Sequence, residues 1–140
     1  MDNSDTIIEL LSLIQQYNLS VPRTLRSEDT EFLSKIYNGI GPENWHPYVR
    51  QFITDILDLF SPAALVHDYE FSIVKKSYKH FTQANIRLAY NCLRLALLGK
   101  VSIVRNTLHS RIKLMGLGLI LAILCQVFGY KAYNNNSEGN

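Results

Sequence analysis

Apolar residues recur at helical spacing in several stretches of the chain, and no stretch alternates between apolar and polar positions as a strand does. Near the N-terminus they follow Asp5, a residue type that often caps helices. These positions are Ile7, Ile8, Leu10, Leu11, Leu13, Ile14 and Tyr17. A second apolar face recurs with a period of 3.6 residues between Pro47 and Phe60. The pattern therefore predicts a mainly α-helical protein.

Glycine and proline mark the breaks between the predicted helices. In chain order, the breaks are Val21-Pro22-Arg23, the glycine turn Asn38-Gly39-Ile40-Gly41-Pro42, and Ser61-Pro62. Ser61 followed by Pro62 is typical of an N-cap and a first helical residue, so we predict a new helix from Pro62 to about Lys76. Thr82 is the expected N-cap of a further helix, over about 83–98.

The stretch from Leu114 to Tyr130 carries no charge, and Gln126 is its one strongly polar residue. Its length is at the short end of the roughly 17–25 residues that cross a bilayer. Lys113 precedes the stretch and Lys131 follows it, as is typical of a membrane span. We predict a transmembrane helix over 111–133. A core helix that is buried all round, or in an oligomer interface, is the alternative.

These patterns divide the chain into a helical domain at 1–110, the apolar helix at 111–133 and a disordered polar tail at 134–140. The chain starts with acidic residues and has no basic residue before Arg23, so we expect no cleaved signal peptide. The predicted location is a membrane, with the protein held as a C-tail-anchored single-pass protein. Oligomerisation through the C-terminal helix is compatible with the same pattern.

Composition narrows the functional classes further. A chain of 140 residues has room for one small catalytic or binding domain. The net charge of +2 is too small for a nucleic-acid-binding surface, so we expect no nucleic acid among its partners. Cys92 and Cys125 both lie inside apolar stretches, which argues against a disulfide framework.

Common cofactor motifs are absent: the sequence contains no zinc pattern such as CxxC or HExxH, no Walker loop, no GxGxxG and no GxSxG. What remains is the glycine loop that begins at Tyr37, and a His67-Asp68 pair on a predicted helix. An isolated His-Asp pair is weak evidence of a site, because a histidine on a buried helix is more often a hydrogen-bonded core residue.

Taken together, the loop and the pair resemble the phospholipase A2 family. The family's calcium loop has the pattern Tyr-x-Gly-x-Gly, and its catalytic helix carries His-Asp with an aromatic residue three positions beyond. The matching residues here are Tyr37, Gly39, Gly41, His67, Asp68 and Phe71. The disulfide-free members, found in viral and phage proteins, have a second helix that opens with Phe-x-x-Ala-Asp, and this chain has Phe81-Thr82-Gln83-Ala84-Asn85. The resemblance covers about residues 37–98.

The resemblance implies a calcium loop, two antiparallel core helices and calcium-dependent hydrolysis of phospholipid esters at a membrane. Ca²⁺ would be held by the backbone carbonyls of Tyr37, Gly39 and Gly41 and by the carboxylate of Asp68, which suits its preference for oxygen ligands. His67 would act as the general base on the attacking water. The amide N–H of Gly39 would help Ca²⁺ to stabilise the oxyanion.

Two departures from the family pattern affect this mechanism. Asn85 stands where the family has the aspartate that orients the histidine, and Phe71 stands where it usually has tyrosine. An amide carries no charge to stabilise the imidazolium, so catalysis would be weak or lapsed. The alternative function is that of a non-enzymatic, tail-anchored membrane protein with a structural or partner-binding role.

Overall fold

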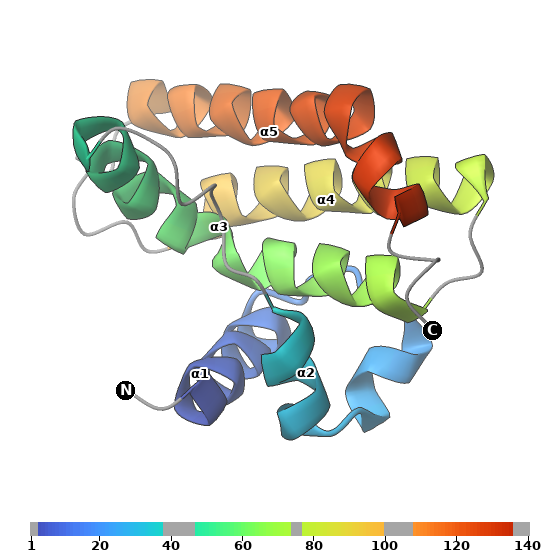
Figure 1. Cartoon of the computed structure of the whole chain (residues 1–140). Helices are drawn as coiled ribbons and strands as arrows, with labels where there is room; N and C mark the ends of the chain where they lie inside the picture. The colour runs from blue at the N-terminus through green and yellow to red at the C-terminus, as the bar shows by residue number, and fades with distance from the viewer. Residues whose placement is uncertain (1–2, 38–46, 74–76, 100–107, 136–140) are drawn as a thin grey trace.

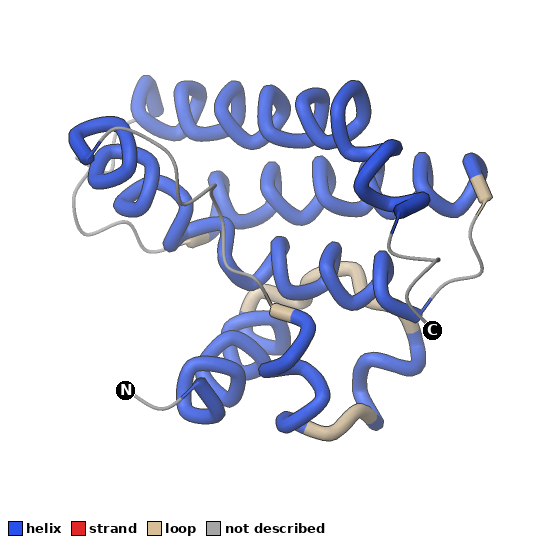
Figure 2. The backbone as a smooth tube through the Cα atoms, viewed as in Figure 1, coloured by secondary structure: helices blue, strands red, loops and turns tan. Residues whose placement is uncertain are grey.

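The computed structural model describes residues 3–37, 47–73, 77–99 and 108–135. Within these ranges the chain forms helices joined by loops, with no strand (Figure 2). The elements are α1 (Asn3–Gln16), the short 3₁₀ helix η1 (Arg23–Ser27), α2 (Thr30–Ile36), α3 (Pro47–Ile73), α4 (Tyr78–Leu98) and α5 (Leu108–Asn135). The prediction of a mainly α-helical protein is therefore confirmed.

Helices α3, α4 and α5 lie in succession, and α1 and α2 pack on the other side of α3 (Figure 1). Phe71, near the end of α3, packs on Phe81, near the start of α4, with ring centroids 5.8 Å apart. Phe81 in turn packs on Tyr130, near the end of α5, at 5.1 Å. Each helix thus runs antiparallel to the next, and α4 lies in the middle.

The core lies between α3 and the helices on either side of it. Leu65 and Leu33 are fully buried, and Tyr69 is fully buried with its hydroxyl donating to Glu28 Oε1 at 3.0 Å. On α4, one face is buried at intervals of three and four residues, as expected for a helix packed along one side. Its buried residues are Phe81, Ala84, Asn85, Leu88, Asn91, Cys92, Leu95 and Ala96.

The predicted break at Ser61-Pro62 is wrong, because α3 continues through Pro62 as one helix. A proline inside a helix removes one hydrogen bond and usually bends the helix. Figure 1 shows α3 changing direction part-way along its length. Phe60 is 1% exposed and Ala63 is fully buried, so packing on both sides of the proline offsets the lost hydrogen bond.

The predicted starts of two other helices are also displaced. Helix α4 begins at Tyr78 behind Ser77, whose Oγ accepts a hydrogen bond from the His80 amide at 3.2 Å, so Thr82 lies inside the helix and is not its cap. Helix α1 begins at Asn3, which places Asp5 in its first turn. Serine, threonine and aspartate are all good caps, so cap preference alone does not choose between them.

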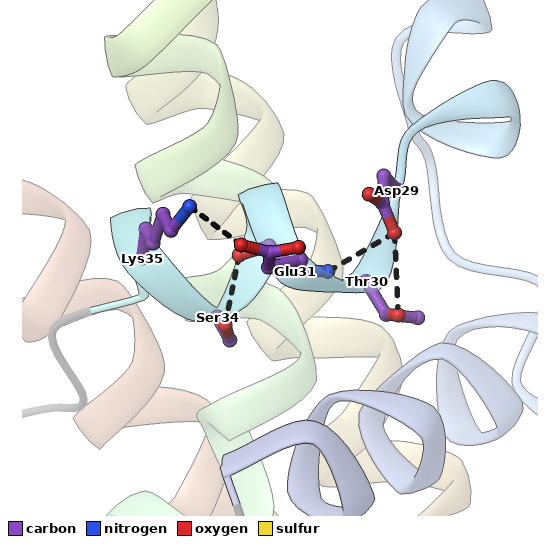
Figure 3. Close-up of polar contacts among 5 residues, drawn as sticks. All are labelled: Asp29, Thr30, Glu31, Ser34 and Lys35. Carbon is purple, nitrogen blue, oxygen red and sulfur yellow. Dashed lines mark hydrogen bonds and ion pairs between the residues drawn. The ribbon is translucent and has the colours of Figure 1, made fainter.

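The short elements η1 and α2 were not predicted from the sequence. Helix α2 is capped by Asp29, whose carboxylate accepts from the Glu31 amide at 3.2 Å (Figure 3). One turn later, Lys35 Nζ donates to Glu31 Oε1 at 2.8 Å. A helix of this length shows too few apolar repeats for periodicity to detect it.

Helix α5 packs along α4 through small residues. At Gly118, an added Cβ would lie 2.7 Å from the Cβ of Cys92, so the two backbones approach closely there. Arg111 begins this contact by donating to the carbonyls of Ala96 at 2.9 Å and Gly99 at 2.6 Å, which satisfies the C-terminal end of α4.

The outer face of α5 is exposed and apolar. Its most exposed large side chains are Leu108, Ile112, Ile120, Ile123, Val127 and Phe128. The alternative of a helix buried all round is therefore wrong for the single chain. The stretch Leu108–Tyr130, of 23 residues, is long and apolar enough to cross a membrane.

Candidate functional site

Helices α3 and α4 bring His67 and Asn85 together. The Nε2 atom of His67 lies 2.9 Å from Oδ1 of Asn85, and both residues are buried, at 8% and 4% exposure. With the oxygen of Asn85 facing the ring, this contact is a hydrogen bond in the tautomer that carries its proton on Nε2 and donates it. The lone pair of the neutral ring is then on Nδ1. Two of the predicted site residues are thus in direct contact.

Asn85 is held on its other side by α5. Its Nδ2 donates to Oε1 of Gln126 at 2.8 Å. The Nε2 of Gln126 lies 3.4 Å from the hydroxyls of both Tyr78 and Thr82. A chain of hydrogen bonds therefore runs from two hydroxyls on α4, through Gln126 and Asn85, to the ring of His67.

The Nδ1 edge of His67 faces Asp68, whose Oδ1 is 3.9 Å away. The side chain of Asp68 is 24% exposed, against 10% for that of His67. The Phe71 ring covers one face of the imidazole, with centroids 4.0 Å apart. The neighbour on the Nδ1 side of the ring is therefore more exposed than the ring itself.

The negative charge of Asp68 acts on the phenol of Tyr37. Burial raises the pKa of the Tyr37 phenol, the negative charges of Asp68 and Asp58 raise it further, and a hydrogen bond with Ser61 opposes the rise. Tyr37 is the C-cap residue of α2. Of the other predicted loop ligands, Gly39 and Gly41 lie outside the described residues.

The described donors match the chemistry of a calcium site in type. Asp68 offers a partly exposed carboxylate, and its charge acts on the phenol of Tyr37, the residue that follows α2. Ca²⁺ prefers such oxygen ligands and accepts backbone carbonyls among them. Within the described part of the chain, no three His, Cys, Asp or Glu side chains come together as a metal-binding group.

Arg87, two residues beyond Asn85, pairs with Glu70 of α3. Its Nε also donates to the hydroxyl of Ser20 at 3.3 Å. Glu70 is 7% exposed, and its Oε2 has no hydrogen-bond partner. These contacts join α4 to α3 and to the segment after α1, so Arg87 supports the helices that carry the site.

A cavity of about 410 Å³ lies away from His67, at the end of α1. It is lined by Leu11, Ile14, Leu19, Val21, Leu25 and Glu28, among others. None of the predicted site residues lines it.

Gln126 is the member of the site that the motifs did not identify. Its signal in the sequence is its position as the single strongly polar residue of a long apolar stretch. Polar residues in such stretches usually face a protein partner. Comparison with known proteins adds no assignment: no family model matches the chain, and no curated protein or solved structure was found to resemble it.

Proposed function

We propose that this protein is a membrane-associated, calcium-dependent hydrolase of phospholipid esters with a phospholipase A2-like fold. The observation that carries the proposal is the 2.9 Å contact between His67 Nε2 and Asn85 Oδ1. It joins the two antiparallel helices at the positions where the family has its histidine and its orienting aspartate. It also leaves Nδ1 free to act as a base.

His67 would take a proton from a water molecule on its Nδ1 side while the water oxygen attacks the ester carbonyl. The bond from that carbonyl carbon to the glycerol oxygen then breaks, and the imidazolium returns the proton to the leaving oxygen. A free fatty acid and a lysophospholipid are the products. Asn85 keeps the ring in the required tautomer throughout by accepting from Nε2.

The groups that would hold Ca²⁺ are the carboxylate of Asp68 and the loop carbonyls that begin at Tyr37. Bound there, Ca²⁺ would supply positive charge for the oxygen of the ester carbonyl as it becomes an oxyanion. Gly39 and Gly41 complete this proposed ligand set by resemblance to the family, and the Gly39 amide would donate to the same oxygen.

Asn85 makes the proposed enzyme a weak one. It orients the ring but offers no negative charge to an imidazolium. In a serine-protease triad, the analogous exchange of aspartate for asparagine lowers kcat about 10⁴-fold. Phe71 adds an apolar ring where the family usually has a hydroxyl. We therefore expect Asn85→Asp to increase activity.

The membrane part of the proposal rests on α5. In its docked position, α5 presents an exposed apolar face that would lie along a lipid surface. Crossing the bilayer as a single-pass tail anchor would require α5 to leave α4, because α4 would otherwise carry Arg87 and Arg94 into the hydrocarbon. Either arrangement would keep the domain at its substrate.

The test is fatty-acid release from liposomes of mixed zwitterionic and anionic phospholipids, with calcium or with a chelator. We expect slow release by the native chain that needs calcium, loss of release in His67→Ala, and a gain in Asn85→Asp. Gln83→Ala is the matched control, because Gln83 is exposed on α4. No release from any of these proteins, each shown to be folded, would refute the proposal.

The second candidate is a non-enzymatic membrane protein that retains the fold. It is favoured by the Phe71 ring at 4.0 Å from the imidazole, which makes this edge of the site apolar. Under this candidate, the native chain would release no fatty acid, whereas it would still bind vesicles through α5.

A further inference from the structure

Gln126 reaches the candidate site from a helix outside the part of the chain that resembles the family. Helix α5 is otherwise apolar from Leu114 to Tyr130. The side chain of Gln126 accepts from Asn85 Nδ2 at 2.8 Å, and Asn85 in turn contacts His67. We infer that Gln126 is a positioning residue: it sets the orientation of the Asn85 amide and thereby the tautomer of His67. The inference rests on the proposed function only where it concerns hydrolysis.

The need for such a residue follows from the chemistry of asparagine. A carboxylate presents an acceptor to the ring whichever way it turns, whereas an amide presents an oxygen in one orientation and an N–H donor in the other. If Nδ2 of Asn85 faced His67, it would donate to Nε2, and the neutral ring would carry its proton on Nδ1. That tautomer has no lone pair on the side that faces Asp68.

Gln126 couples the orientation of the Asn85 amide to its own, because Asn85 Nδ2 faces its side chain. With Oε1 of Gln126 accepting from Nδ2, the oxygen of Asn85 is the atom left to face the ring. In this orientation Gln126 Nε2 donates to the hydroxyls of Tyr78 and Thr82, each 3.4 Å away, so the opposite orientation of Asn85 requires Gln126 to turn as well. In this arrangement, each oxygen and each nitrogen of the Asn85 and Gln126 amides has a hydrogen-bond partner.

The arrangement links the docking of α5 to the state of the site. The aromatic contacts of Tyr130 with Phe81 at 5.1 Å and with Tyr78 at 5.4 Å hold the end of α5 where Gln126 reaches Asn85. When α5 leaves α4, Asn85 loses its acceptor, and its amide is free to turn. The competent tautomer of His67 is therefore expected only while α5 is docked.

The test measures the tautomer directly, without relying on hydrolysis. Two-bond ¹H–¹⁵N correlation spectra of the full chain, at a pH of about 9 where imidazole rings are neutral, distinguish a protonated ring nitrogen from an unprotonated one. The His67 signals are assigned from their loss in His67→Asn. We expect protonated Nε2 and unprotonated Nδ1 in the native chain.

Three variants separate positioning from simple structural support. Gln126→Met has a similar length but no comparable acceptor, so we expect the ratio of the two tautomers to fall about tenfold, as for loss of one neutral hydrogen bond. Gln126→Glu keeps an acceptor and should keep the native tautomer. Combining Asn85→Asp with Gln126→Met should restore it, because a carboxylate needs no orientation.

Each outcome decides the inference. A native chain with the proton on Nδ1 of His67 would overturn it, because the side-chain amides of Asn85 and Gln126 would then have the opposite orientation. An unchanged tautomer in a folded Gln126→Met would also overturn it. A shift in Gln126→Met that Asn85→Asp abolishes would establish it, whether or not the native chain hydrolyses lipid. Ile123→Ala, an exposed residue on α5, is the control for nonspecific effects of substituting this helix.

Discussion

Asn91 on α4 closes a pair of hydrogen bonds with the backbone of Ser20, more than seventy positions earlier in the chain. The Ser20 amide donates to Asn91 Oδ1 at 2.8 Å, and Asn91 Nδ2 donates to the Ser20 carbonyl at 2.9 Å. Asn91 is fully buried, so no water replaces these bonds. Arg94 adds a third contact by donating to the Tyr17 carbonyl at 2.6 Å. The segment after α1 is therefore part of the same folded unit as the site.

Replacing Asn91 should destabilise the whole chain. In Asn91→Ala, the partly buried N–H and C=O groups of Ser20 lose their partners, and an unpaired buried group costs about 1–3 kcal/mol. We expect the free energy of unfolding, measured with urea, to fall by about 2 kcal/mol or more. Gln83→Ala on the exposed side of α4 should change it by less than about 0.5 kcal/mol. Similar losses in the two variants would contradict this account.

Two glycines of α5 should respond in opposite directions to the same substitution. A Cβ added at Gly118 would lie 2.7 Å from the Cβ of Cys92, whereas one added at Gly116 meets nothing within 4 Å. Gly118→Ala should lower the free energy of unfolding by about 1–3 kcal/mol through overpacking. Gly116→Ala should raise it by up to about 1 kcal/mol through helix propensity. Chemical denaturation of both variants would measure the two changes in the free energy of unfolding. Equal effects would mean that α5 does not dock on α4 at this point.

The hydrophobic pattern predicted the long helices well, because periodicity reports which face of a helix is buried. It failed where local signals compete. Pro62 indicated a helix start, yet the burial of Phe60 and Ala63 holds α3 together through the proline. Ser77 and Thr82 are both good cap residues, and the packing of residues at the start of α4 favours the earlier one.

The contacts of the candidate site were predictable in part. His67, Asp68 and Asn85 could be found because the resemblance is carried by local motifs, and the structure brings His67 into contact with both of the others. Gln126 could not be assigned to the site, since it lies 41 positions beyond Asn85 and no motif connects them. Contacts between distant segments depend on how α5 docks, which periodicity does not describe.

Calcium should stabilise the native chain if Asp68 is a ligand. A ligand that binds only the folded state at 100 times its Kd adds about 2.7 kcal/mol to the free energy of unfolding. We expect calcium, but not magnesium at the same concentration, to raise Tm in the native chain and in Asn85→Asp. In Asp68→Asn the rise should disappear. A rise that is equal in all three proteins would place the calcium elsewhere.

Alkaline pH should weaken the fold through Cys92. Burial raises the pKa of this thiol to about 12, above its ordinary value of 9.0. Between these two values the unfolded chain loses a proton that the folded chain keeps, so the free energy of unfolding falls as the pH rises, by at most about 1.4 kcal/mol per pH unit from this group. Urea unfolding between pH 8 and 11 measures the slope. Cys92→Ala should reduce the slope. An unchanged slope would mean that other groups cause it, such as Tyr37 and Tyr69, because burial also raises their pKa values.

The exposed face of α5 should govern membrane binding. Ile123 and Phe128 are 59% and 73% exposed, and inserting such a side chain into lipid contributes about 1.5–3 kcal/mol. Exchanging both for lysine should therefore reduce co-sedimentation with vesicles more than tenfold. Ile8→Lys, at 58% exposure on α1, provides the matched control and should leave binding unchanged.

Extraction with alkaline carbonate then distinguishes the two arrangements of α5. A helix lying along the surface is released, whereas a tail anchor that crosses the bilayer stays in the membrane and, having left α4, no longer orients Asn85.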